Sequence, residues 1–204
     1  MIYLIGGPAR CGKSTLAERV RHKVDGDVLS ADAFKKTLLQ NLRPSWVPDI
    51  FDHVIAPIGT MSSATRQIDR LRRRDERMWQ FYDGYIDADL QASPHKDILI
   101  EGNIWPDFIA GLRHTHKAVF LVDLAPAEDQ FERLQKIRDS DDDNNWMKAR
   151  DFNDRALKKW AKFNRLRSER YVQLCREHGY PYFDISQRGI GYGQDRAYVS
   201  LLQK

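Results

Sequence analysis

The most constraining feature of the sequence is a glycine-rich segment near its start, Gly7-Pro-Ala-Arg-Cys-Gly-Lys-Ser-Thr15, which fits the phosphate-binding pattern GxxxxGK[ST]. The apolar stretch from Met1 to Ile5 precedes it, and from Ser14 to Val24 apolar residues recur four positions apart, as on one helix face. A strand, a glycine loop and a helix in this order bring backbone N–H groups and a helix N-terminus around one anion. The sequence therefore predicts a nucleotide triphosphate site; the alternative is a glycine turn that merely opens a helix.

Each residue type in this loop has a use in binding a triphosphate. Gly7 and Gly12 permit the backbone angles and the close approach that phosphates require. Lys13 should reach the β- and γ-phosphates, and the hydroxyl of Ser14 should bind Mg²⁺. The residues expected to contact the nucleotide are Gly7, Ala9, Arg10, Cys11, Gly12, Lys13, Ser14 and Thr15.

Length and composition limit the architecture that can surround the loop. A chain of 204 residues suits one α/β domain with a sheet covered on both faces, and no linker or repeat divides residues 1–204. It has no secretory leader and no apolar run that would span a membrane, so we expect a cytoplasmic location. Its two cysteines are too few for a disulfide framework. The formal charge of +4 suits an anionic ligand and does not by itself favour nucleic acid.

A carboxylate follows the second predicted strand. Asp27 to Ser30 reads as that strand, and Asp32 comes just after it at the start of a predicted helix. Open α/β sheets bind ligands at the carboxyl ends of their strands, so Asp32 should face the crevice opposite the phosphate loop. Asp is also a common N-cap residue, so capping the helix is the alternative role for this position, and both roles can hold.

Two further predicted strands end in a carboxylate. Glu101 lies at the end of Ile98 to Gly102, and Asp123 follows Ala118 to Val122. A carboxylate at such a position, as in a Walker B strand, can hold Mg²⁺ directly or through water. We expect Glu101 to serve the metal, because Gly102 behind it lets backbone and ligand come close. Asp123 is interpreted as structural and remains the alternative metal ligand.

A long amphipathic helix is predicted from Ser62 to Leu90, and it carries a cluster of arginines. The cluster consists of Arg66, Arg70, Arg72, Arg73, Arg74 and Arg77. Arginine suits bidentate contacts with phosphate, so the cluster would fit a phosphorylated acceptor or a nucleic-acid backbone. The alternative, which we favour, is a solvated helix face balanced by Asp69, Asp75 and Glu76.

A helix predicted from Glu128 presents Arg133 and Arg138 before a polar run, residues 139–145, interrupts it. Such a run cannot pack in a core, so we expect the tip of a lid that comprises approximately residues 133–155. The two arginines would clamp the nucleotide when this lid closes. The alternative is an ordinary surface pair with Glu132 and Asp139.

The remaining elements are weaker predictions. One or two helices should run from Trp146 to Glu177, and a last short strand from Tyr182 to Ile185. Gly189, Gly191 and Gly193 are expected to form a loop, and their spacing does not match a dinucleotide-binding fingerprint.

The order of these features resembles the nucleoside monophosphate kinase-like branch of P-loop kinases. Five strands alternate with helices, with the phosphate loop after the first strand, an acid after the second and an arginine-bearing helix after the fourth. Ser30-Ala-Asp32 followed by Phe34-Lys35, and Ile100-Glu-Gly102 followed by Pro106, are similar to motifs of 2-phosphoglycerate kinases and zeta-toxin-like kinases. The resemblance covers essentially the whole chain. It implies a three-layer α/β/α P-loop NTPase fold with a five-stranded parallel sheet and a helical lid.

The resemblance implies an ATP-dependent kinase that uses Mg²⁺ and transfers the γ-phosphoryl group to a hydroxyl of a small-molecule acceptor. The catalytic residues would be Lys13, Asp32, Arg133 and Arg138, and the metal ligands Ser14 and Glu101. Asp32 would act on the acceptor hydroxyl and the arginines on the triphosphate. The sequence specifies neither the acceptor nor an oligomeric state, although the AspGlyxProArg segment of adenylate kinases is absent. Two alternatives stay open, a nucleotide-gated switch protein and a polynucleotide-end kinase.

Overall fold

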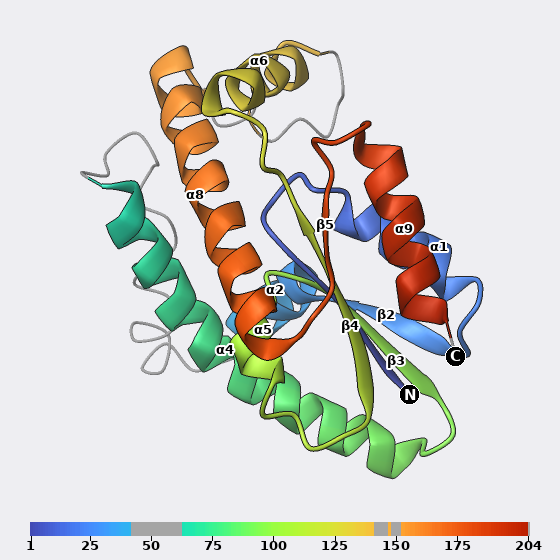
Figure 1. The fold of residues 1–204 in the computed structure, drawn as a ribbon. Helices are drawn as coiled ribbons and strands as arrows, with labels where there is room; N and C mark the ends of the chain where they lie inside the picture. The colour runs from blue at the N-terminus through green and yellow to red at the C-terminus, as the bar shows by residue number, and fades with distance from the viewer. Residues whose placement is uncertain (42–62, 141–146, 148–151, 204) are drawn as a thin grey trace.

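Five parallel strands form the sheet at the centre of the molecule, in the order β2-β3-β1-β4-β5 (Figure 1). The computed structural model describes residues 1–41, 63–140, 147 and 152–203. The strands are β1 (Ile2–Gly6), β2 (Gly26–Ser30), β3 (Asp97–Gly102), β4 (His116–Val122) and β5 (Tyr182–Asp184). The predicted α/β fold with a five-stranded parallel sheet is therefore confirmed.

Helices cover both faces of the sheet, so the described residues form three layers (Figure 1). The helices are α1 (Lys13–Arg21), α2 (Ala31–Asn41), α4 (Ala64–Ala92), α5 (Pro106–Ile109), α6 (Ala127–Arg138), α8 (Asp154–His178) and α9 (Ile190–Leu202). Successive side chains of a strand point to opposite faces, and both faces of this sheet are buried. Ile2 and Leu4 of β1 pack in the core formed with α4, α5 and α8, whereas Ile5 packs in the core formed with α1 and α9.

The long helix α8 has clear start and stop signals. The Asn153 side chain accepts a hydrogen bond from the backbone N–H of Ala156 at 2.9 Å, which caps the first turn. Gly179 ends the helix in the left-handed conformation, with φ of 74°. Between these ends α8 packs on α6 through a small core that includes Leu134, Leu157 and Trp160. This packing joins the helices that flank the predicted lid, whose residues 141–146 and 148–151 lie outside the described residues.

The predicted loop after β5 is wrong, because Gly191 and Gly193 lie inside helix α9. Each interior glycine disfavours a helix by about 1 kcal/mol relative to alanine, which is why the sequence pattern suggested a loop. Tertiary packing outweighs this cost, since Ala197 and Leu201 are fully buried against the core shared with α1. A Cβ atom at Gly193 would lie 3.1 Å from the side chain of Ile185, so the absent side chain lets the helix approach β5 closely.

Part of the arginine cluster on α4 is buried rather than solvated, which corrects the predicted role of Arg74 and Asp75. Nη2 of Arg74 lies 2.5 Å from Oδ1 of Asp75, and only 5% and 8% of the two side chains are exposed. Oδ2 of Asp75 accepts a hydrogen bond from Nε1 of Trp105 at 2.9 Å. The Trp105 ring in turn stacks on Tyr171 of α8, with centroids 4.5 Å apart. This network links α4 to α8 through the segment that follows β3.

In the described ranges, no helix combines the length and the apolar character that crossing a membrane requires. The long helices α4 and α8 both carry many charged residues on their exposed faces.

Replacing Asp75 with Asn should strongly destabilise the fold, because the buried Arg74 guanidinium would lose its charge partner. Breaking a buried ion pair in this way typically costs about 3–5 kcal/mol. Urea unfolding followed by circular dichroism measures the effect as a lower free energy of unfolding. Asp69→Asn, at an exposed position of the same helix, is the matched control and should change stability by less than about 0.5 kcal/mol. Equal unfolding midpoints for the two variants would show that the pair contributes nothing.

Candidate active site

The glycine loop joins β1 to α1 in a conformation that glycine alone adopts easily. Gly7 has φ of +136°, and a Cβ atom there would lie 2.0 Å from the carbonyl oxygen of Leu121 in β4. Gly12 has φ of +79° and is the N-cap of α1, where no side chain caps the helix. The first turn of α1 contains no acidic residue. The N–H groups of this turn therefore point into the loop with no side-chain acceptor, as an anion site requires.

The other predicted contact residues lie around this turn. Ala9 is half-buried, and its carbonyl oxygen accepts a long hydrogen bond of 3.5 Å from Asn164 of α8. Arg10 is exposed and has φ of +64°, a region that is costly for a residue with a Cβ atom. Burial raises the pKa of Cys11 to about 12, so its thiol is uncharged at neutral pH and serves packing. The remaining two, Ser14 and Thr15, are exposed at the start of α1.

Lys13 places a buried ammonium group inside the loop. Only 8% of this residue is exposed, and its Nζ donates a hydrogen bond to the carbonyl oxygen of Pro8 at 2.6 Å. Burial lowers the pKa of Lys13, and the positive charge of Arg167 lowers it further, while Glu101 and Asp32 act in the opposite direction. Among the described residues, no carboxylate contacts this ammonium, so it is a buried cation that lacks an anionic partner.

Glu101 lies beside the loop at the end of the neighbouring strand. It pairs in register with Ile5 of β1 and with Ser30 of β2, and only 7% of the residue is exposed. Within the part of the chain that is described, its carboxylate makes no hydrogen bond or ion pair. Gly102, with φ of +150°, lets the first residue of α2 approach, since a Cβ atom there would lie 2.3 Å from that of Ala31. Glu101 is therefore an uncommitted carboxylate near Lys13.

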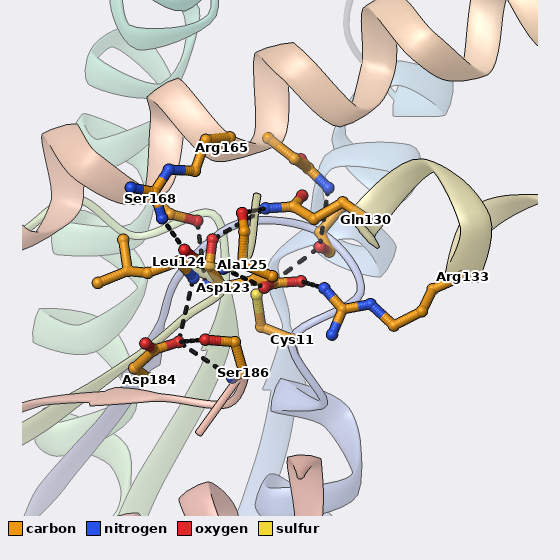
Figure 2. A network of polar contacts seen from close by, with 12 residues as sticks. Cys11, Asp123, Leu124, Ala125, Gln130, Arg133, Arg165, Ser168, Asp184 and Ser186 are labelled. Carbon is orange, nitrogen blue, oxygen red and sulfur yellow. Dashed lines mark hydrogen bonds and ion pairs between the residues drawn. The ribbon is translucent and has the colours of Figure 1, made fainter. Parts of the chain in front are cut away.

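The carboxylate of Asp123, at the end of β4, is committed to structural contacts (Figure 2). Oδ1 accepts a hydrogen bond from the Ala125 N–H at 3.1 Å, and Oδ2 pairs with Nη2 of Arg133 at 2.6 Å. Its backbone also bonds to two helices, through Ser168 Oγ of α8 at 3.1 Å and Gln130 Nε2 of α6 at 3.0 Å. These contacts fasten both helices to the end of β4, which agrees with the structural interpretation of Asp123.

The two arginines predicted for the lid have different surroundings. Arg133 bonds to Asp123 rather than to Glu132, and this pair lies next to Cys11 of the loop in Figure 2. Arg138 lies at the end of α6, where it pairs with Asp139 at 2.7 Å and with Asp154 at 2.6 Å. Hydrogen bonds to these two carboxylates raise the pKa of Arg138. The structure thus brings Arg133 close to the loop and ties Arg138 to the start of α8.

Asp32 lines a hollow between α2 and α4. It is the second residue of α2, inside the helix rather than at its N-cap, and 78% of its side chain is exposed. Its nearest charged neighbour is Lys35, at 3.7 Å from Nζ to Oδ1. The hollow is lined by Ala31, Asp32, Lys35, Arg74, Asp75, Met78, Tyr82 and Asn103. The structure therefore sets two carboxylates and two basic side chains around one cavity.

Two residues near the loop were missed from the sequence. Gln194 of α9 donates a hydrogen bond from Nε2 to the carbonyl oxygen of Gly12 at 2.8 Å, and it escaped notice because α9 was expected as a loop. Arg167 of α8 is 2% exposed and donates from Nη2 to Oδ1 of Asn103 at 2.8 Å. Arg167 lies four residues from both Phe163 and Tyr171, a spacing that would have placed it on the buried face of the helix.

The solved structures described next are distant neighbours of this chain. No protein-family model matches the chain, and no curated protein matches its sequence. A shikimate kinase from Bacteroides thetaiotaomicron aligns over 96% of this chain and 95% of its own, with 12% identity and a TM-score of 0.48.

Two other solved structures are similar to a comparable degree. A shikimate kinase from Acinetobacter baumannii in complex with shikimate aligns over 96% of this chain and 87% of its own, with 16% identity and a TM-score of 0.45. An uncharacterized protein from Eubacterium ventriosum aligns over 96% and 94%, with 13% identity and a TM-score of 0.44. At these values the neighbours assign no function to this chain, and a functional proposal has to rest on the site.

Proposed function

We propose that the protein is a phosphotransferase that moves the γ-phosphoryl group of ATP to a hydroxyl of a small-molecule acceptor. The observation that carries the proposal is the buried ammonium of Lys13, which lacks a carboxylate partner among the described residues and lies at the open N-terminus of α1. A buried cation at such a helix end needs an anion, and a polyphosphate supplies one of matching charge.

On the donor side, the loop residues from Gly7 to Thr15 would hold the triphosphate. Backbone N–H groups and the α1 N-terminus would bind phosphate oxygens, and Lys13 would exchange its bond to Pro8 for a bond to the transferring group. Arg133 of α6 would exchange its bond to Asp123 for a bond to the triphosphate and so add positive charge there. Arg138 belongs to the same predicted lid, at the far end of α6.

The residues present fit a magnesium ion. Glu101 supplies a carboxylate that has no partner in the described ranges, and Ser14 offers an exposed hydroxyl at the start of α1. Mg²⁺ is commonly bound by one or two protein oxygens together with substrate phosphates and water. Bound there, the ion would neutralise charge on the phosphates and so lower the barrier to transfer.

On the acceptor side, Asp32 would bind the hydroxyl that is phosphorylated. In the reaction the bond from the γ-phosphorus to the oxygen bridging to the β-phosphate breaks, and a bond to the acceptor oxygen forms. The leaving group is ADP, and the hydroxyl proton passes to Asp32 and then to solvent. A carboxylate is a weak base for an alcohol, so the main contribution of Asp32 is a hydrogen bond that aligns the hydroxyl.

Two of the six arginines in the α4 cluster are not available to a nucleic-acid acceptor. Arg74 is buried against Asp75, and Arg72 pairs with Asp107, so neither presents a free guanidinium on the helix surface.

The alternative of a nucleotide-gated switch protein differs from the kinase in one respect, because a switch needs no acceptor. A scan for ADP release with Mg²⁺, ATP and candidate acceptors, including sugars, nucleosides, antibiotics, glycerate derivatives and oligonucleotide ends, tests the proposal as a whole. ADP release that no acceptor accelerates would contradict the kinase and favour the switch.

Lys13→Ala should lower the rate of ADP release at least ~10²-fold, because it removes a preorganised charge at the transferring phosphoryl group. A coupled assay of ADP formation measures the rate. Lys23→Ala, an exposed lysine just beyond α1, is the matched control and should behave as wild type. Wild-type turnover in Lys13→Ala would remove the basis of the proposal.

Glu101→Gln should raise the Mg²⁺ concentration needed for half-maximal rate far more than Asp123→Asn does, because only the Glu101 carboxylate is uncommitted. Titration of Mg²⁺ at fixed ATP concentration gives both values. The reverse order of the two variants would move the metal to Asp123.

Asp32→Asn should leave ATP affinity nearly unchanged while acceptor-dependent turnover falls by ~10²- to 10⁴-fold, the usual range for losing a general base. ATP affinity is measured by calorimetry and turnover by ADP release. Full transfer by this variant would mean that Asp32 only favours the start of α2 and that the acceptor hydroxyl binds elsewhere.

A further inference from the structure

The last helix of the chain, α9, reaches the glycine loop through one buried side chain, that of Gln194. Only 6% of this residue is exposed, and its Nε2 donates a hydrogen bond to the carbonyl oxygen of Gly12 at 2.8 Å. Burying a polar side chain is costly unless it makes hydrogen bonds, and this bond satisfies one of its donors. What the bond contributes to the site depends on the peptide group to which the Gly12 carbonyl belongs.

The peptide group between Gly12 and Lys13 leads from the loop into α1. Its carbonyl oxygen also accepts a hydrogen bond from the backbone N–H of Leu16 at 3.1 Å, so donors from two different helices hold the same oxygen. In a trans peptide group the C=O and the N–H point in opposite directions. Holding this oxygen therefore directs the N–H of Lys13 away from α1 and into the loop, where it is one of the groups that would bind phosphate oxygens.

Glycine at position 12 makes this peptide group difficult to hold from within α1 alone. Gly12 has φ of +79°, and glycine is the residue whose backbone rotates most freely. Among the described residues, no side chain caps the start of α1. The amide of Gln194 therefore supplies a restraint that comes from outside α1.

Two glycines allow Gln194 to come this close. A Cβ atom at Gly12 would lie 2.3 Å from Nε2 of Gln194, so the amide occupies the space that a side chain would fill. At Gly193, the residue before Gln194, a Cβ atom would lie 3.1 Å from the side chain of Ile185. Glycine disfavours the interior of a helix, so this close approach to β5 explains Gly193 better than helix formation does.

Helix α9 is packed firmly on α1, which gives Gln194 a fixed base. Ala197 and Leu201 are fully buried in a core shared with α1. On the surface, Arg19 of α1 pairs with Asp195 of α9 at 2.8 Å. The amide of Gln194 is therefore held at a defined position relative to the loop.

We propose that Gln194 is a positioning residue for the phosphate loop, which fixes the peptide group between Gly12 and Lys13 so that the Lys13 N–H is directed at the bound triphosphate. This inference rests on the proposed function, because it concerns how the loop binds a triphosphate. Without the amide donor, the peptide group would also adopt orientations in which this N–H points elsewhere. Each such orientation reduces the fraction of protein that is ready to bind, and the apparent affinity falls with it.

Two variants of Gln194 remove the donor. Gln194→Met keeps a similar length without an N–H group, and Gln194→Glu keeps the shape but offers only acceptors at neutral pH. Calorimetry measures the binding of adenylyl imidodiphosphate, an ATP analogue that is not hydrolysed at its β–γ bridge, in the presence of Mg²⁺. We expect each variant to bind the analogue at least ~5-fold more weakly than the wild type, the effect of losing about one hydrogen bond.

The motion of the Lys13 N–H in the ligand-free protein gives a readout that packing alone would not change. NMR relaxation of the amide nitrogen measures this motion on both the fast and the slow time scales. Both variants of Gln194 should increase the motion at Lys13. Asp195→Asn is the matched control, because it removes the ion pair with Arg19 and leaves Gln194 in place. We expect this control to change neither the motion nor the affinity.

The outcomes separate this inference from the proposed function. Failure of the wild type to bind the analogue would overturn the proposed function. Normal binding by the wild type with equal affinity in Gln194→Met, or with the same weakening in Asp195→Asn, would overturn the positioning role and leave the phosphotransferase intact. Unchanged motion of the Lys13 N–H in the variants would do the same. If Gln194→Met does not fold, the motion in Gln194→Glu decides alone, because repulsion between the new carboxylate and the analogue does not affect the ligand-free protein.

Discussion

The central constraint on the described structure is the burial of one ammonium group, that of Lys13. Lys13 is buried at the start of α1, and its ammonium group contacts a carbonyl oxygen rather than a carboxylate. A buried charge without an anionic partner lowers the stability of the fold. Binding of an anion would remove this cost. Gly7 lies against β4 with no room for a side chain, so the loop approaches this strand closely.

The strand order explains why the acids on either side of the loop differ. β1 lies between β3 and β4, so Glu101 and Asp123 both end strands next to the loop. The β3 end is followed by Gly102, which admits α2 without giving Glu101 a partner. The β4 end is followed by the segment that begins α6, which supplies the Ala125 N–H and Arg133 to Asp123. Two strands of the same type thus end in one free carboxylate and one bound carboxylate.

Local patterns predicted the sheet, the loop and the strand-end acids, because these depend on short runs of residue types. The sequence pattern failed where packing between residues far apart in the chain determines the local structure. Arg74 looked like a surface arginine until Trp105 and Asp75 enclosed it, and α9 looked like a loop because its glycines disfavour a helix. For Arg133 the sequence offered a nucleotide clamp or a surface pair with a neighbour in sequence, yet its partner, Asp123, follows a strand ten positions earlier. Sequence spacing does not show which acid of another element pairs with a given arginine, because several acids are equally near to the arginine along the chain.

The bond from Gln194 to Gly12 spans 182 positions of the sequence, so the glycine loop is held by a segment that lies far from it along the chain. Contacts between such distant segments carry a large loop-closure cost and tend to form late in folding. A nascent chain that has already made β1, the glycine turn and α1 therefore still lacks the contact that α9 makes with this loop. The arrangement of the loop thus depends on a helix that is made long after it.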